Sequence, residues 1–250
     1  HYKDIYKELV GDILRSRLYE KLDRIYVGIS GGDRNHLPYI VEKMKIIHEN
    51  TKLRRYELPT LQHLQSHARE YPEGKTIYIH TKNASKNIAD KTAEEFKTKL
   101  GWWSREIHRH YMSHHIIKKH DSCLNLLSSH DCVGVDFRNQ PENSSHFAGN
   151  FWWANNEHLI KLPDLKSKMF PISGPFGDHP RHYCERWLLC YNNAENSFDK
   201  PRFKSLFWGK HLRSSLDESM KTTSMDYDQR YQHFENCLTL QHDGKLPVRI

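Results

Sequence analysis

Residues 146–163 read HFAGNFWWANNEHLIKLP, a segment that combines a strand pattern with a helix pattern. FAGNFWWA is aromatic and apolar, as in a buried strand, and NNEHLIKL has the apolar spacing of a helix. Side chains alternate along a strand, so the adjacent tryptophans Trp152 and Trp153 are expected to point to opposite sides. We therefore expect one face of this strand to join the core and the other face to have a different use.

Helix and strand patterns alternate along the rest of the chain. The expected helices span 4–19, 37–50, 60–71 with Thr60 as N-cap, about 90–129 with a break near Gly101, 155–162 and 182–191. The expected strands span 24–32, 52–58, 75–83, 131–137, 147–154 and 203–209. This alternation predicts an α/β sandwich with a mostly parallel central sheet and helices on both faces. We expect one domain over 1–250, with an irregular tail at 214–250.

Composition limits the class of protein. The 250 residues have a formal net charge of +7, which suits an anionic partner such as a nucleotide, phosphate or nucleic acid. The charge is scattered, so a basic nucleic-acid-binding domain is the weakest of the readings. No apolar run approaches the roughly 20 residues of a membrane span. The chain begins at His1, so we expect a piece of a longer protein, with the cytoplasm and the secretory lumen both open as its location.

The five cysteines form no Cys-x-x-Cys pair, and their number is odd. Known zinc spacings are therefore not supported, and no metal site is predicted. Cys184 and Cys190 lie in one expected helix with poor geometry for a mutual disulfide. Buried free thiols are the expected state of the cysteines.

The clearest strand, 75–83, ends in IYIHTKN. Ligands bind at the carboxyl ends of the strands in open α/β sheets, so the end of this strand is a candidate site. His80 and Lys82 alternate there and point the same way, and together they could hold a diphosphate without a metal. The alternative is that both are solvated loop residues.

Two other charged residues lie among aromatic residues. Arg105, in GWWSREIHRHY, is a candidate phosphate clamp or part of a solvated basic helix face. Glu185, in RHYCERWLLCY, has apolar neighbours that tend to raise the pKa of a carboxyl, which suits a general base. The alternative for Glu185 is a salt bridge to Arg181 or Arg186. In HFAGNFWWA, Gly149, Asn150 and the aromatic rings suit a sugar, or alternatively core packing.

The order of these motifs resembles a family of predicted glycosyltransferases found in bacteria, large DNA viruses and some eukaryotes. The matching segments are YIHTKN, WWSRE, DCVGVDF, HFAGNFWWANNEHLIKLP and ERWL, within roughly residues 1–190. The family pattern reads YIHTKG, WR, D.VG, HFSGNFWWA and E.W. Asn83 stands here in place of the usual Gly, and Ala148 in place of the usual Ser, and each change bears on the pocket.

The resemblance implies a GT-A-like fold, with a nucleotide-sugar-binding half at 1–140 and an acceptor half at 141–213. It implies sugar transfer from a UDP- or GDP-sugar to a glycan or other hydroxyl acceptor. Most GT-A enzymes hold a divalent metal with Asp-x-Asp, and this chain has His80-Thr-Lys82 at that place. The resemblance therefore implies metal-independent, inverting transfer, with no cofactor beyond the donor and with a non-catalytic binding module as the alternative.

The resemblance also assigns roles to individual residues. Glu185 is the expected base. The expected diphosphate-binding residues are His80, Lys82, Asn83 and Arg105, and the expected sugar- or acceptor-binding residues are His146, Gly149, Asn150 and Trp152. Trp152 is preferred over Trp153 as the binding tryptophan because it shares a strand face with Asn150.

Overall fold

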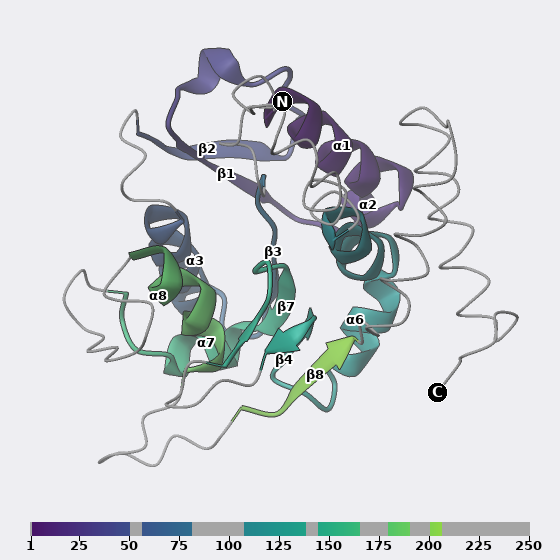
Figure 1. The fold of residues 1–250 in the computed structure, drawn as a ribbon, viewed down its shortest axis with the longest axis vertical. Helices are drawn as coiled ribbons and strands as arrows, with labels where there is room; N and C mark the ends of the chain where they lie inside the picture. Colours follow the sequence, from purple (N-terminus) through teal and green to yellow (C-terminus); the bar gives the residue numbers. More distant parts are fainter. Residues whose placement is uncertain are drawn as a thin grey trace, which may run out of the picture.

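The structure, a computed structural model, describes residues 2–50, 57–81, 108–138, 145–165, 180–190 and 201–206. Among these residues the largest sheet has four strands, in the order β3-β7-β4-β8 (Figure 1). Their bounds are β3 Lys75–Tyr78, β7 Trp152–Asn155, β4 Cys132–Val135 and β8 Phe203–Leu206. Two smaller sheets pair β1 Ile25–Ser30 with β2 Met44–Asn50, and β5 Phe137–Arg138 with β6 His146–Phe147.

The chain is mixed α/β, but its sheets are small and the described strands do not form a clear mostly parallel central sheet. β7 pairs antiparallel with both of its neighbours, β3 and β4, and the parallel neighbours in this sheet are β4 and β8. The physical reason is that the chain has already reversed direction between β5 and β6, which pair antiparallel. After the turn at 148–151, β7 continues antiparallel to β4.

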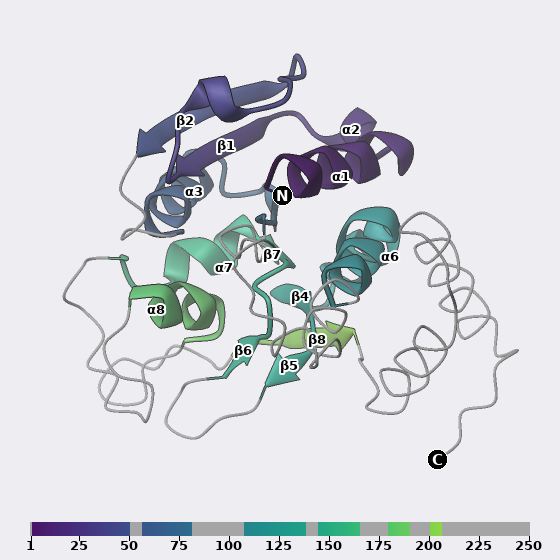
Figure 2. The ribbon, with the colours of Figure 1, turned by 45° about the horizontal axis from the view of Figure 1, so that its top comes forward.

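Helices cover both faces of the four-stranded sheet, as the sequence predicts (Figure 2). On one face lie α1 Tyr2–Arg15, the π-helix His114–Lys118 and α6 His120–Leu126; on the other lie α3 Leu58–Glu70, α7 Asn156–Lys161 and α8 Pro180–Arg186. Shorter elements are α2 Leu18–Lys21, the 3₁₀ turns Arg34–His36 and Trp187–Leu189, and a helical turn at 108–113.

The two faces of the sheet belong to two separate apolar clusters. Alternate side chains of one strand therefore enter different clusters. Trp153 and Val133 pack with α1, the π-helix and α6, whereas Trp152 and Cys132 pack with α3, α7 and α8. The prediction that Trp152 and Trp153 point to opposite sides is confirmed.

An expected helix and an expected helix N-cap differ from the structure. The expected helix at 37–50 is instead β2 from Met44, preceded by a turn region. Short apolar runs such as KIIH do not distinguish helix from strand, and pairing with β1 decides the outcome. Thr60 is not the N-cap of its helix, because the helix begins earlier, at Leu58 after Glu57. The Thr60 hydroxyl lies 2.8 Å from Nε2 of His48 on β2.

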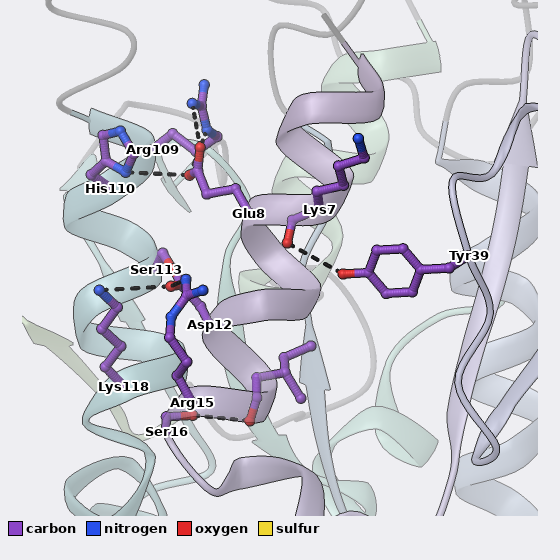
Figure 3. A network of polar contacts seen from close by, with 11 residues as sticks. Lys7, Glu8, Asp12, Arg15, Ser16, Tyr39, Arg109, His110, Ser113 and Lys118 are labelled. Carbon is purple, nitrogen blue, oxygen red and sulfur yellow. Dashed lines mark hydrogen bonds and ion pairs between the residues drawn. The ribbon is translucent and has the colours of Figure 1, made fainter. Parts of the chain in front are cut away.

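A charged network joins α1 to the 108–118 segment (Figure 3). Arg109 is 1% exposed and donates from its guanidinium to Glu8 at 2.9 and 3.1 Å. Nδ1 of His110 lies 3.2 Å from the same carboxylate. One turn further along α1, the buried carboxylate of Asp12 accepts hydrogen bonds from Ser113 and Arg15. This network fixes the position of the chain directly after the segment that contains Arg105.

Candidate functional site

The candidate site lies at one edge of the four-stranded sheet. β3 and β4 run in the same direction because each is antiparallel to β7. Residues that follow β3, residues that follow β4 and residues that precede β7 therefore share this edge. The ends of these three strands therefore meet at one edge of the sheet. The sequence predicts the site at such an edge from the positions of the strand ends alone.

The turn before β7 places Gly149 and Asn150 at the edge. Both have left-handed backbone, with φ of 99° and 57°. Glycine adopts this region freely, and asparagine tolerates it better than most residues. The backbone N–H of Asn150 donates to the Phe147 carbonyl oxygen at 3.0 Å and closes the turn. FAGNFWWA is therefore two strands, β6 and β7, separated by a turn, and not the single strand that the sequence predicts.

The side-chain amide of Asn150 is engaged by the protein itself. Its Nδ2 donates to Glu57 Oε2 at 2.6 Å and to the Cys184 carbonyl at 3.5 Å. Its Oδ1 accepts from Trp152 Nε1 at 2.8 Å. Asn150 is 1% exposed. The amide that the sequence assigns to sugar hydroxyls thus organises the turn instead of facing solvent.

Glu57, which sequence reasoning missed, is the centre of these contacts. Its Oε2 accepts from Asn150 and from the Tyr78 hydroxyl at 3.1 Å, and its Oε1 lies 3.5 Å from His80 Nδ1. Burial, and then the negative charge of Glu57, raise the pKa of Tyr78 well above its usual value. We call Glu57, Tyr78, His80, Asn150 and Trp152 the Glu57 cluster. The sequence signal for Glu57 is its place just before Leu58-Pro59, a helix start.

His80 lies at the edge as predicted and is attached to the turn. Because a carbonyl oxygen only accepts, Nε2–H of His80 donates to Gly149 O, at 2.8 Å. The ring contacts Phe151 edge-on, with ring centres 5.6 Å apart. The side chain remains 23% exposed. Lys82, Asn83 and Arg105, the other predicted diphosphate-binding residues, lie outside the described residues.

Neither tryptophan presents an open ring face. Trp152 is 1% exposed and stacks on Tyr78 with ring centres 5.2 Å apart. Trp153 is 3% exposed and donates from its indole to Ile116 O at 2.8 Å. The expected division, in which one tryptophan packs and the other presents its face, is therefore not found. Trp152 instead packs against Tyr78 in the core and donates to Asn150 at the edge.

The remaining predicted residues lie around the Glu57 cluster. Glu185 is half-buried on α8, and the carbonyl of the preceding Cys184 accepts from Asn150, which links this helix to the cluster. Burial, and then the charges of Glu57 and Glu185, raise the pKa of the Cys184 thiol. Both carboxylates therefore act on one thiol. His146 lies on β6, paired in register with Arg138 of β5.

The described cysteines are free, which confirms the sequence expectation for Cys123, Cys132, Cys184 and Cys190. Burial raises the pKa of the Cys123 and Cys190 thiols to about 12, so these thiols remain protonated near neutral pH. In the described ranges no three His, Cys, Asp or Glu side chains are grouped to hold a metal ion. None of the helices described is both long and apolar enough to cross a membrane.

Replacing Glu57 by alanine is expected to destabilise the protein by about 1–3 kcal/mol. The substitution leaves the buried Tyr78 hydroxyl and the Asn150 amide without this acceptor. Urea unfolding followed by tryptophan fluorescence measures the change. The control is Glu70→Ala, an exposed glutamate at the other end of α3, for which a change within about 0.5 kcal/mol is expected. Equal stability of the two variants would show that the Glu57 cluster does not hold the edge together.

Comparison with known proteins gives one match. Residues 5–197, more than half of the chain, match the model of a family described as a domain of unknown function, DUF8361. No curated protein and no solved structure matches the sequence significantly.

Proposed function

We propose that this chain, which belongs to the DUF8361 family, is a glycosyltransferase that moves a sugar from a nucleotide-sugar donor to a hydroxyl acceptor. The observation that carries the proposal is the convergence of three sequence-distant motifs. YIHTKN, GNFWWA and ERW supply His80, Asn150 and the helix of Glu185, and hydrogen bonds join all three at one sheet edge. The finer proposal for the fold is a GT-A-like nucleotide-sugar-binding arrangement.

In the proposed reaction one residue accepts the proton of the acceptor and other residues stabilise the leaving diphosphate. The acceptor oxygen bonds to the anomeric carbon, the bond from that carbon to the diphosphate breaks, and the electron pair leaves with the diphosphate. Glu185 takes the proton of the acceptor hydroxyl. Lys82, with Asn83 and Arg105, stabilises the leaving negative charge, a role that a metal performs in Asp-x-Asp enzymes. His80, whose ring nitrogens both face protein groups, holds the turn at this edge in position. Displacement in one step gives inversion.

The proposal is supported by the fixed position of the His80 side chain at the edge where the donor would lie. Glu57 and Gly149 engage both ring nitrogens of His80, so the imidazole has little rotational freedom left to lose on binding. Fixed groups stabilise a developing charge more effectively than mobile ones because they need not reorganise during the reaction. The formal net charge of +7 further favours an anionic donor.

A thermal-shift panel of UDP-, GDP- and CMP-sugars, with EDTA or with manganese, tests the proposed function. Saturation at about 100 times Kd adds about 2.7 kcal/mol, which corresponds to a rise of about 5–10 °C in Tm for a chain of this size. We expect one donor to give this rise in EDTA and Lys82→Ala to abolish it.

The control is Lys75→Ala, at the exposed amino end of β3, which is expected to retain the shift. A panel without any shift would oppose the proposal. A shift that persists in Lys82→Ala would remove Lys82 from the site. A shift seen only with manganese would contradict metal independence.

A further inference from the structure

Asp136 lies at the same edge as the Glu57 cluster but on another strand. It directly follows β4, as His80 follows β3 after Ile79. Its carbonyl accepts from Ala148 N at 3.0 Å, so it is bonded to the turn that carries Gly149 and Asn150. β3 and β4 flank β7, and two strand spacings place Asp136 and His80 about 10 Å apart.

The backbone of Asp136 is left-handed, with φ of 53°. In the described residues the other non-glycine positions with positive φ are Arg17 and Asn150. Asn150 belongs to the same edge, so two of these three uncommon conformations are found there. Such conformations cost free energy and concentrate at sites where a side chain must be aimed.

The carboxylate of Asp136 is held through one oxygen. Oδ2 accepts from Arg138 at 2.9 Å and lies 3.4 Å from His108 Nε2. Within the described part of the chain, no side chain donates to Oδ1. Burial opposes ionisation, but the hydrogen bonds and charges of His108 and Arg138 outweigh it and lower the pKa of Asp136. Among the described residues, the group is thus an ionised carboxylate whose Oδ1 receives no side-chain donor.

Asp136 and Glu57 therefore differ in what they can do. Glu57 already accepts two hydrogen bonds on Oε2 and faces His80 with Oε1, which makes it part of the framework. Asp136 is fixed in place by its partners on Oδ2, and its Oδ1 has no donor among the side chains that the structure describes. A ligand group that donates hydrogen bonds to a carboxylate, such as a sugar hydroxyl, matches this oxygen.

We propose that Asp136 binds hydroxyls of the donor sugar, with the diphosphate on the His80 side of the edge about 10 Å away. This inference rests on the proposed function, because it states how the donor lies along the edge, with its sugar at Asp136 and its diphosphate near His80. It adds a substrate-binding residue from DCVGVDF to those expected from the other motifs.

A simpler explanation of Asp136 is that aspartate tolerates left-handed backbone. Asn and Gly tolerate that conformation at least as well, so Asp136→Asn and Asp136→Gly both preserve the backbone. Under the simpler explanation both variants bind ligands like the wild type. Under the proposal Asp136→Gly loses the contact with the sugar, and Asp136→Asn keeps only a neutral acceptor in place of the charged one, whatever their effect on Tm.

The test compares calorimetric affinities for two probes: the nucleotide sugar with the largest shift in the panel, and its free nucleoside diphosphate. Loss of a charged hydrogen bond is expected to weaken nucleotide-sugar binding roughly tenfold to hundredfold in both variants. Affinity for the nucleoside diphosphate is expected to stay within about twofold. The matched control is Asp131→Asn, an arginine-paired aspartate just before the opposite end of β4, which is expected to leave both affinities unchanged.

Unchanged nucleotide-sugar affinity in the folded Asp136 variants would overturn the role of Asp136 and leave the proposed function intact. Equal weakening of both probes would also overturn it, since the sugar would then not be what Asp136 recognises. If the wild type binds no nucleotide sugar, the proposed function fails and this inference fails with it.

Discussion

Replacing Glu185 by glutamine is expected to lower the rate of sugar transfer by about 10²–10⁴-fold, the contribution of a positioned general base. Glutamine has nearly the same shape but cannot accept the acceptor proton. The helix of Glu185 is held by the Asn150 bond to the Cys184 carbonyl and by buried Trp187, whose indole donates to Pro163 O at 2.9 Å. Because glutamine keeps nearly the same shape and these contacts remain, folding and donor affinity are expected to stay close to wild type.

Steady-state kinetics with the stabilising donor, together with Tm, separate the two effects for Glu185→Gln. The control is Glu157→Gln, an exposed glutamate on α7, which is expected to retain full activity. Full transfer activity in Glu185→Gln would exclude Glu185 as the base. Loss of donor affinity in parallel with the rate would indicate a binding role instead.

Replacing Glu8 by alanine is expected to destabilise the protein by about 3–5 kcal/mol, because it leaves the buried Arg109 without its carboxylate partner. The loss is large because a buried guanidinium has few means of regaining solvation. Urea unfolding measures it. Glu42→Ala, at an exposed glutamate, is the control and is expected to change stability by less than about 0.5 kcal/mol.

A double variant, Glu8→Leu with Arg109→Met, distinguishes charge burial from loss of packing. Well-packed apolar replacements of a buried ion pair are often neutral, so the double variant is expected to recover most of the loss. If Glu8→Ala is as stable as Glu42→Ala, the network in Figure 3 does not hold α1 to the 108–118 segment.

The same network makes stability depend on pH. Burial raises the pKa of Glu8, but hydrogen bonds and charges from His110 and Arg109 outweigh it and lower that pKa below its ordinary 4.5. A carboxyl with a lowered folded-state pKa stabilises the fold above its unfolded value, and this stabilisation is lost as the pH falls toward the folded value. Wild type is therefore expected to lose stability below about pH 4.5, and Glu8→Gln to lose less over the same range.

Sequence patterns predict the secondary structure where an apolar period is sustained along a segment or where turn residues mark the ends of the segment. β1, β4, α7 and β8 are found within the expected ranges, α1 overlaps its expected range and begins two residues earlier, and both faces of the sheet carry helices. The helix expected at 37–50 is wrong because its apolar spacing also suits β2, and pairing with β1 is a tertiary effect. The direction of β7 follows from the antiparallel pairing of β5 with β6, a tertiary contact that local propensity did not reveal.

The candidate site was predicted in outline and not in its contacts. The strand-end argument places His80 just past β3, as the structure does, but the sequence predicts FAGNFWWA as one strand and misses the turn inside it. The motif contains a turn with left-handed backbone. The side-chain amide of Asn150 in this turn donates to Glu57, a residue 93 positions earlier. No periodicity encodes such a long-range contact. The adjacent tryptophans are explained by two cores, one on each face of the sheet, rather than by one core and one open ring.

The most direct test of the account is donor turnover. The wild-type protein is incubated in EDTA with the nucleotide sugar that stabilises it and a mixture of glycan acceptors, and released nucleoside diphosphate and elongated glycan are measured. The account predicts release of both products in wild type and in Glu157→Gln, and a loss of about 10²–10⁴-fold in Glu185→Gln. Stabilisation by the donor without any product in wild type would contradict the enzyme and identify a sugar-nucleotide-binding module instead.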